Sequence, residues 1–581
     1  MHRERVGGGA MKDMNDTTRG MRALACALCC ALGTSPIARG DSLDDLLVLI
    51  PADVVSAIAI ADMQRLSGGL DECIARMDRK ETLVAGRSID HLKRALQLRE
   101  GFDESGSFAG WTMLEGTALL VPCDDPAAFI KANLTPSADA NLAPGAEGIG
   151  SFRGEPVYSK ALAKHALISS SKAVIDGYDV KGGSGATLAT RFGERGMQLA
   201  NGGDLIAWGS GMALTEMAAK NEATPTRVAA LLSGIAGGLL VVDADALGIS
   251  LRGYVVYAPA SELARLAADT KRVAGNAGAT LAGLPKASFY VAAAIDATAL
   301  GGGSKVDALA TALGVTELMP AWLAQAKDGV RSVRFAAYPS KLGLLAGGLL
   351  NDSAFVIETE HPEKIRDLFK SSLLAQAGVG DGVRREPAWE DARTLKDGAV
   401  VDAFELKVSP LGASEAVGED LSGVPMQQLM RQAFFGARGM HGFGKALSGS
   451  VIVTFSQRPD VFARALAAAN GGESLKDESV LVSMRPWLIP GAQCELFISA
   501  GQILKVVRQL ASTFGMGEMQ LPTIASKSAP IACALRIDPQ AAELAVMIPT
   551  ATLAAGYDQM LNSFLGGPRT EPAPPAEPAK E

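Results

Sequence analysis

The feature that most constrains the fold of this chain is a phrase that the sequence uses twice. LIPADVVSAIAIADMQRL occurs near the N-terminus, and GLPKASFYVAAAIDATAL occurs in the middle of the chain. When Pro51 is aligned with Pro285, Asp62 falls on Asp296 without a gap. A pattern that recurs over a long period describes how a fold is assembled before it describes any chemistry. The repeat therefore predicts related structural units.

A looser third copy, LIPGAQCELFISAGQIL, opens at Leu488, but Gly501 stands where the other copies have aspartate. A second pattern also recurs, in which an apolar strand ends in a turn, a proline follows and a helix-like segment begins. Its prolines are Pro126, Pro259, Pro362, Pro459 and Pro539. Proline suits the first turn of a helix, where its missing N–H would have had no partner.

Aspartates are placed to cap these predicted helices. Asp125 and Asp538 directly precede a proline, and their carboxylates can accept from free amides of the first helical turn. Asp62 and Asp296 are expected to do the same without a proline.

The order of these units predicts two related halves, residues 41–275 and residues 280–565. Each half begins with a Leu-Pro strand and is expected to close with a strand and a proline-opened helix, at Pro259 and Pro539. Two predicted hairpins cover residues 239–258 and residues 330–350, the second turning at Pro339. Residues 135–148, 181–186 and 378–398 are expected to be surface loops. The predicted fold class is α+β, with antiparallel β-sheets covered by helices and an internal duplication.

Both ends of the chain differ from this pattern. Residues 1–40 are typical of an export signal, with a positive start, an 11-residue apolar stretch from Ala23 to Gly33 and small residues at Ala38 and Gly40 before a cleavage site. Residues 566–581, GGPRTEPAPPAEPAKE, have too few apolar side chains to fold and are expected to form a disordered, proline-rich tail. The expected location of the protein is therefore periplasmic or extracellular.

Charge limits the expected partners. The whole chain has a formal net charge of −8, and residues 1–40 hold six basic and three acidic side chains, so the remainder is at −11. A net acidic protein has no electrostatic reason to bind nucleic acid or an anionic membrane face. After residue 40 no apolar run reaches the ~18 residues that a membrane-crossing helix needs, so no transmembrane helix is expected in the mature chain.

A search for catalytic and cofactor motifs names no site residue. GMHGFGKA, from Gly439, approaches a phosphate-binding loop, but Ala446 stands where a serine or threonine is required, and we expect a glycine-rich hairpin loop there. The adjacent acids Asp44 and Asp45 would point to opposite faces of a strand and form no acid–base couple. Trp389, in EPAWEDAR, is expected to be an exposed loop anchor. We predict no catalytic, cofactor-binding or metal-binding residue and no cofactor.

Histidine and cysteine do not change this expectation. The histidines are His2, His91, His165, His361 and His441, and none has another histidine three to five residues away. His361 is expected at a helix start, and His165 is expected to begin a strand. The cysteines after the export segment are Cys73, Cys123, Cys494 and Cys533, which form no CxxC pair. Four free thiols and one or two disulfides both remain open.

The combination of an export segment, a Leu-Pro strand that ends in aspartate (LIPADVVSAIAIAD) and an acid-Pro helix start (VPCDDPAAFIK) resembles a class of exported bacterial proteins. This class is abundant in planctomycete-like bacteria and is filed as a domain of unknown function. The resemblance spans roughly residues 43–565 and rests on short structural motifs. It implies an α+β repeat fold outside the cytoplasm and carries no catalytic residues.

The leading functional expectation is an exported, non-catalytic envelope protein that binds an unknown protein partner or a small ligand. Long strand-rich repeats without an intact catalytic motif favour this class. Two other classes remain open, a carrier that holds an apolar small molecule or lipid in a cavity, and a hydrolase with an unrecognised site.

Overall fold

The structure is a computed structural model. It describes residues 43–556 except 78–86, 97, 99, 137–147, 153–154, 179–185, 221–230, 272–280, 303, 305–328, 344–346, 381–382, 411–433, 435, 437–438 and 514–523. The expected export segment and the expected tail lie outside the described residues.

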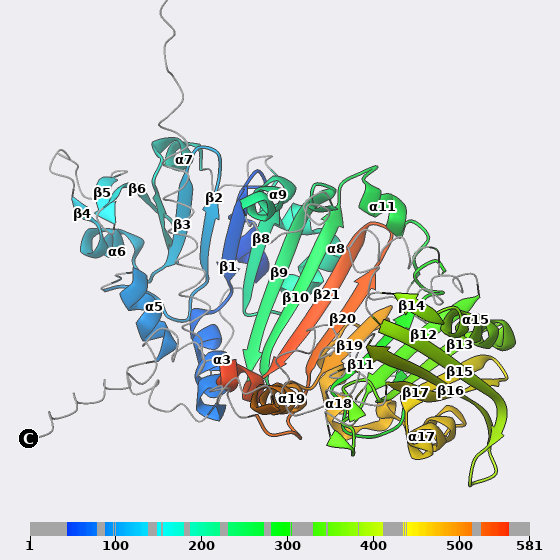
Figure 1. Ribbon diagram of the computed structural model, residues 1–581. Coiled ribbons are helices and arrows are strands. Elements are labelled where there is room, and N and C mark those ends of the chain that lie inside the picture. Colours follow the sequence, from blue (N-terminus) through cyan, green and yellow to red (C-terminus); the bar gives the residue numbers. More distant parts are fainter. Residues whose placement is uncertain are drawn as a thin grey trace, which may run out of the picture.

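The described strands form one antiparallel sheet of 21 strands (Figure 1). One part of the sheet contains, in spatial order from its edge, β4 (Thr135–Pro136), β5 (Gly148–Phe152), β6 (Glu155–Ala161), β7 (His165–Ser169), β3 (Thr117–Pro122), β2 (Phe108–Thr112), β1 (Ser56–Ile60), β8 (Leu205–Ser210), β9 (Ile235–Asp245) and β10 (Gly248–Tyr257).

The order continues from β10 without a break through β21 (Ala541–Pro549), β20 (Ile531–Ile537), β19 (Cys494–Ile498), β11 (Val291–Asp296), β12 (Val330–Ala337), β13 (Asp352–Thr359), β18 (Ser450–Ser456), β17 (Met440–Leu447), β16 (Val400–Pro410), β15 (Val383–Thr394) and β14 (Gly378–Gly380). The middle of the sheet is therefore the pairing of β10 with β21, from distant parts of the chain.

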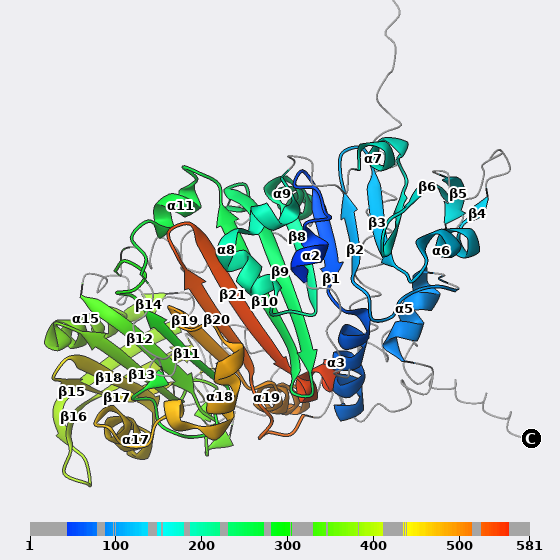
Figure 2. The same cartoon turned by 180° about the vertical axis from the view of Figure 1, so that it is seen from behind.

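One face of the sheet, called here the covered face, packs against α2 (Leu43–Leu47), α7 (Lys172–Gly177), α8 (Leu188–Ala200), α17 (Pro459–Ala469) and α18 (Ser479–Met484). Figure 2 shows α2, α8 and α18 in front of this face. Two buried clusters fill the layer between helices and sheet. One contains Trp111 and Phe192, and the other contains Phe462 and Phe497.

On the opposite face, called here the open face, the helices described below lie at the two ends of the sheet and beside its middle. At one end lie α3 (Met63–Arg76), α5 (Ser88–Leu96) and α6 (Pro126–Asn133), and at the other lies α15 (Pro362–Leu374). Two further helices, α9 (Gly211–Lys220) and α11 (Glu262–Ala267), lie near strand ends in Figure 1. In the same view no described helix crosses the middle of β10, β21 and β20.

The repeated phrase forms β1 and β11, two strands in the interior of this sheet. The aspartates that follow act as caps, because Asp62 Oδ1 accepts from the N–H of Arg65 at 2.8 Å, and Asp296 Oδ1 accepts from the N–H of Ala299 at 2.8 Å. The prolines also have equivalent contacts, since Pro51 and Pro285 each form an isolated antiparallel bridge. The expected strands and caps are confirmed.

The proline-opened helices are confirmed at Pro126, Pro362 and Pro459, each in the first turn of its helix. Pro259 lies before the Ser261 cap of α11 and outside the first turn. Asp125 caps α6 as expected, through the N–H of Ala128 at 3.0 Å.

The expectation of a helix after Pro539 is wrong, because residues 541–549 form β21. Asp538 and Ala541 close a tight turn, with the Asp538 N–H donating to the Ala541 carbonyl at 2.8 Å. Proline is also favoured at the second position of such a turn. Pro539 therefore lies in a hairpin turn and does not begin a helix. Asp538 therefore belongs to a turn between β20 and β21 and caps no helix.

Two other expectations need correction. The hairpin in residues 239–258 is confirmed as β9 and β10, but β12 pairs with β13 and not with residues 341–350. Gly343 and Gly348, at φ of 74° and 72°, turn that segment out of an extended path. Residues 378–398, expected as a loop, instead contain β14 and β15. Pro387 is tolerated in β15 because this strand lies next to the sheet edge.

Candidate functional site

The candidate site is the middle of the open face, where six neighbouring strands present apolar side chains to solvent. Burial alternates along β9, β21, β20, β19 and β11, so residues on the covered face are mostly buried and those on the open face are mostly half-buried, whereas residues 251–256 of β10 are half-buried on both faces. Leu240 is 41% exposed and Leu544 is 46% exposed. Large apolar side chains are thus left accessible in the centre of the sheet.

The strand registers arrange these side chains in continuous rows, because directly paired residues of antiparallel strands lie on the same face. The first row contains Leu240, Gly253, Leu544, Leu535, Cys494 and Ile295. The second row contains Val242, Leu251, Val546, Cys533, Leu496 and Ala293. Neither row holds a charged side chain, so the six strands form one apolar floor.

Gly253 makes a low point in this floor, between the exposed Leu240 and Leu544. A Cβ built on Gly253 would meet its nearest atoms, both of Leu544, at 3.9 Å. That is an ordinary van der Waals distance, so the space above the glycine is unoccupied by neighbouring side chains.

Helices border the floor on several sides. Leu214 of α9 lies over Gly238, with Cδ1 3.2 Å from the position of an added Cβ. Leu66 of α3 belongs to the buried cluster that also contains Ala244 of β9. Ala267 of α11 packs with Tyr257 and Ile537 at the ends of β10 and β20. Leu535, Cys494 and Ile295 of the first row also pack against this last cluster, so the exposed part of the floor lies on β9, β10 and β21.

The charged side chains of these central strands lie on the other, covered face. Glu543 is 3% exposed and lies between two arginines. Arg195 of α8 donates from Nε to Glu543 Oε1 at 2.7 Å, and Arg536 of β20 also donates to Glu543 Oε1. The hydrogen bond from Arg195 to this carboxylate raises the pKa of the guanidinium. Polarity is thus inverted, with the charges buried and the apolar residues exposed.

A second charged group is a pair of carboxyls at the end of β8 and β9, where Arg65 of α3 reaches them. Asp204 and Asp243 belong to neighbouring strand positions, and Asp204 lies 2.6 Å from Arg65 Nε. Burial, with the nearby Asp204 charge, raises the pKa of Asp243 to about 7. Ser250, the cross-strand neighbour of Asp243, has a buried hydroxyl without a hydrogen-bond partner among the described residues.

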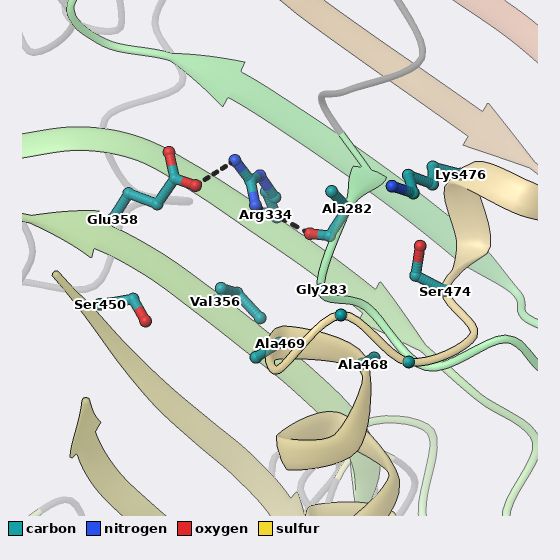
Figure 3. Close-up of a pocket in the computed structure, with 12 residues that line it drawn as sticks. Ala282, Gly283, Arg334, Val356, Glu358, Ser450, Ala468, Ala469, Ser474 and Lys476 are labelled. Carbon is teal, nitrogen blue, oxygen red and sulfur yellow. Dashed lines mark hydrogen bonds and ion pairs between the residues drawn. The ribbon is translucent and has the colours of Figure 1, made fainter. Parts of the chain in front are cut away.

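A pocket of about 240 Å³ lies on the covered face, at β12, β13 and the end of α17 (Figure 3). Arg334 donates to Glu358 at 2.5 Å and to the Ala282 carbonyl at 2.9 Å. Glu358 is also held by the hydroxyl of Ser332 at 2.8 Å. Because Glu358 already neutralises Arg334, the pocket offers an incoming anion little beyond the exposed Lys476, and we assign it no ligand.

The cysteines in the described part of the chain are free thiols. Cys73 and Cys123 are buried, whereas Cys494 and Cys533 are half-buried and belong to the two rows of the open face. Burial raises the pKa of Cys494 to about 12 and also raises that of Cys533. Both thiols on the floor are therefore protonated and poorly nucleophilic at neutral pH.

Other residues singled out from the sequence are dispersed. His361 is at the N-cap of α15 and His165 begins β7, as expected. His165 is buried beside Ser107, whose carbonyl oxygen lies 2.9 Å from Nε2. Asp44 and Asp45 lie in the first turn of α2, so the expected strand is wrong there.

The glycine-rich segment from Gly439 is also corrected, because residues 440–447 form β17 and not a hairpin loop. Gly442 permits this packing, since an added Cβ would lie 2.1 Å from the Thr454 carbonyl oxygen. Trp389 is no loop anchor, since it lies in β15 and stacks on Phe404 at a centroid separation of 5.8 Å.

Within the described residues, no group of three histidine, cysteine, aspartate or glutamate side chains is arranged to hold a metal ion. Among the same residues, no helix combines the length and apolar character needed to cross a membrane.

Comparisons with known proteins add little to this geometry. No family model matches the sequence, and no curated protein matches it. The chain is similar to two solved structures of TP0453, in crystal forms I and III. Form I has 13% identity and a TM-score of 0.22 over 39% of this chain and 81% of that chain. Form III has 8% identity and a TM-score of 0.21 over 39% and 82%. Likeness at this level assigns neither a fold nor a function.

Proposed function

We propose that this protein is a non-catalytic binding protein whose open face receives an apolar ligand. The observation that carries the proposal is the apolar stretch of the open face on β9, β10 and β21, where Leu240 and Leu544 are exposed and no described helix crosses the middle of β10 and β21. Contiguous apolar patches on soluble proteins commonly mark binding surfaces. Covering such a patch is favourable by roughly 25 cal/mol per Å² of apolar surface removed from water.

The inverted polarity of the central strands supports this choice. A solvent-facing sheet surface ordinarily carries polar side chains, with the apolar set turned to the core. Here the charged residues Arg536 and Glu543 face the covered side, while Leu544 faces solvent. This arrangement suits a face that is covered by an apolar ligand when the protein functions.

The hydrolase alternative has weaker support. Asp243, which lies beside Asp204, has a raised pKa of the kind that acid catalysis uses. However, Asp204 is 4% exposed and its carboxylate is held in an ion pair with Arg65 of α3. A carrier with an enclosed cavity also has less support than an open binding face, since the pocket beside Arg334 is small and polar.

The binding proposal predicts that one charge on the floor strongly weakens binding. Leu240→Lys is expected to weaken the binding of a solvatochromic apolar dye at least about tenfold, because the ammonium would be desolvated beneath the ligand. Stability should change by no more than about 0.5 kcal/mol, since the position is exposed. Fluorescence titration and urea unfolding measure the two effects.

The matched control is Leu247→Lys, at a leucine that is 57% exposed in the turn between β9 and β10 and lies off the floor. It should leave dye binding unchanged. Equal dye binding by both variants and the unmodified protein would rule out the floor as the binding surface.

We further propose that the chain consists of two related halves that meet at β10 and β21. The strand order supports this proposal. Outward from β10 the successive strands are β9, β8, β1, β2 and β3, and outward from β21 in the other direction they are β20, β19, β11, β12 and β13. In this correspondence the strands of the repeated phrase, β1 and β11, occupy the same place. An experimental structure in which the halves fail to superimpose would refute the duplication.

Export remains part of the proposal, on the strength of the apolar stretch in residues 23–33 and the small residues before Asp41. N-terminal sequencing of the protein from its native host tests it. A mature chain that begins near Asp41 is expected, and a cytoplasmic chain that retains residues 1–40 would contradict it.

A further inference from the structure

We infer that the covered face holds a second binding site, on strand β10, for the oxyanion group of a small ligand. Arg252 supplies the charge that attracts this group, and the phenol of Tyr254 donates a hydrogen bond to it. Carboxylate and phosphate groups both have the chemistry that a guanidinium and a hydroxyl recognise. The site is independent of the apolar stretch on the open face.

Arg252 differs from other arginines on or beside the covered face, because no carboxylate is in contact with it. Four of those arginines each form an ion pair with a glutamate, namely Arg195, Arg334, Arg485 and Arg536. Arg252 forms neither a hydrogen bond nor an ion pair with any described residue, although its side chain is half-buried on a central strand. Its guanidinium donors are therefore available to a ligand.

The strand registers place apolar residues on both sides of Arg252. Its direct neighbours on the adjacent strands are Val241 of β9 and Ala545 of β21, and both are buried. Each of these side chains is shorter than that of arginine, and neither can pair with a guanidinium. The charge therefore lies above an apolar surface, where an ion pair with a ligand is stronger than it would be in bulk water.

Hydroxyl groups without partners lie on either side of Arg252 along β10. Ser250, Arg252 and Tyr254 are alternate residues of the strand, about 6.7 Å apart, so their side chains share the covered face. The hydroxyl of Ser250 is buried, and neither it nor the phenol of Tyr254 forms a hydrogen bond with a described residue. Burial raises the pKa of Tyr254, so the phenol keeps the proton that it can donate at neutral pH.

The charges around these residues favour an anion. Glu543, the direct neighbour of Tyr254 on β21, is already held by two arginines. Asp243 is the other acid that acts on this part of β10, and its pKa, raised to about 7 by burial, leaves it mostly uncharged below neutral pH. The positive charge of Arg252 is therefore not cancelled by a carboxylate in contact, and an incoming oxyanion can neutralise it.

The binding experiment is calorimetric titration of the full chain with phenyl phosphate and with benzoate, at about pH 6 and constant ionic strength. The two probes share an aromatic ring and differ in their oxyanion, so the tighter binder identifies the preferred group. Arg252→Gln should weaken binding of that probe at least about tenfold, because a charge-assisted hydrogen bond is lost. Tyr254→Phe should weaken it about fivefold, because one hydrogen bond from a hydroxyl is lost.

The matched control is Arg191→Gln, which removes the same charge from an exposed arginine of α8 on the same face. It should leave the binding of both probes unchanged. Without a ligand, Arg252→Gln and Tyr254→Phe should unfold at the same urea concentration as the unmodified protein, since neither side chain loses a hydrogen bond. Equal weakening by Arg191→Gln and Arg252→Gln would mean a general attraction of anions and would overturn the site.

Asp243 gives this site a pH dependence of its own. As the pH rises through about 7, Asp243 gains a charge that attracts Arg252 and repels an anion, whereas Asp204 and Arg65, which also act on Asp243, remain paired with each other.

The affinity for sulfate, whose charge does not change in this range, should therefore fall several-fold between about pH 5.5 and pH 8. Asp243→Asn should remove this fall. The site is wrong if none of the three anions binds the unmodified protein, if Arg252→Gln binds them as tightly, or if Asp243→Asn keeps the same pH profile for sulfate.

Discussion

Replacing Glu543 by glutamine is expected to lower the free energy of unfolding by about 3–5 kcal/mol, the largest effect we predict for a single substitution. Glutamine keeps the shape of the side chain but removes its charge. Arg536, 5% exposed at its side chain, and Arg195 would then share a buried site without their carboxylate. Breaking a buried ion pair by removing one partner leaves an uncompensated charge away from water.

Urea unfolding of Glu543→Gln measures this loss, with Glu194→Gln as the matched control. Glu194 lies on α8 beside Arg195 but is exposed, so its substitution should cost less than about 0.5 kcal/mol. The double variant Arg536→Met/Glu543→Leu should recover much of the stability, since apolar groups of similar volume can replace a buried pair. A loss below about 1 kcal/mol in Glu543→Gln would show that the cluster is open to water.

The second large effect concerns Asp243, and it makes the protein less stable as the pH rises. The folded protein holds the pKa of Asp243 at about 7, above its ordinary value of 3.8, because burial and the neighbouring Asp204 disfavour its charged form. The folded state therefore binds this proton more tightly than the unfolded state. The stability that it contributes is complete below about pH 4 and is lost as the pH rises to about 7.

The two pKa values would give a loss of about 4 kcal/mol at most, at 1.36 kcal/mol per unit. Asp243 is partly exposed and faces Arg65 and Arg252, which lower its pKa, so we expect roughly 2 kcal/mol. In Asp243→Asn this part of the pH dependence should vanish. Urea unfolding between about pH 4 and pH 8 measures the difference between the two proteins, which removes the contribution of other carboxyls. Parallel pH profiles would contradict the assignment.

Much of the fold could be predicted from local patterns, because several elements depend on neighbouring residues alone. The repeated phrase gave two strands followed by capping aspartates, since a cap needs only a carboxylate three residues before a free N–H. The hairpin in residues 239–258 likewise pairs two strands that are adjacent in the chain, so it could be predicted from neighbouring residues. Proline was less reliable, because Pro539 serves a turn as well as it would serve a helix start.

The candidate site was not predictable in the same way. In β21 the sequence AAELAVMIP is apolar at both alternating sets of positions except for Glu543. The ordinary rule that charge faces water would turn the Glu543 side outward and bury Leu544. The structure does the reverse, because arginines from residues 195 and 536 meet Glu543 inside. Only the tertiary pairing of β10 with β21 brings Gly253 next to Leu544 and creates the floor.

That pairing also sets the order in which the protein can be completed during synthesis. Strand β10 forms its hairpin with β9 early, but its other edge pairs with residues 541–549, which are made much later. Pairing between such distant segments is slow, and a bare strand edge is a template for association with other chains. A nascent chain interrupted before Ala541 would carry this edge in the middle of an unfinished sheet, beside an apolar floor. Chaperones that act on the growing chain therefore have a defined period in which to protect it, which ends when β21 docks.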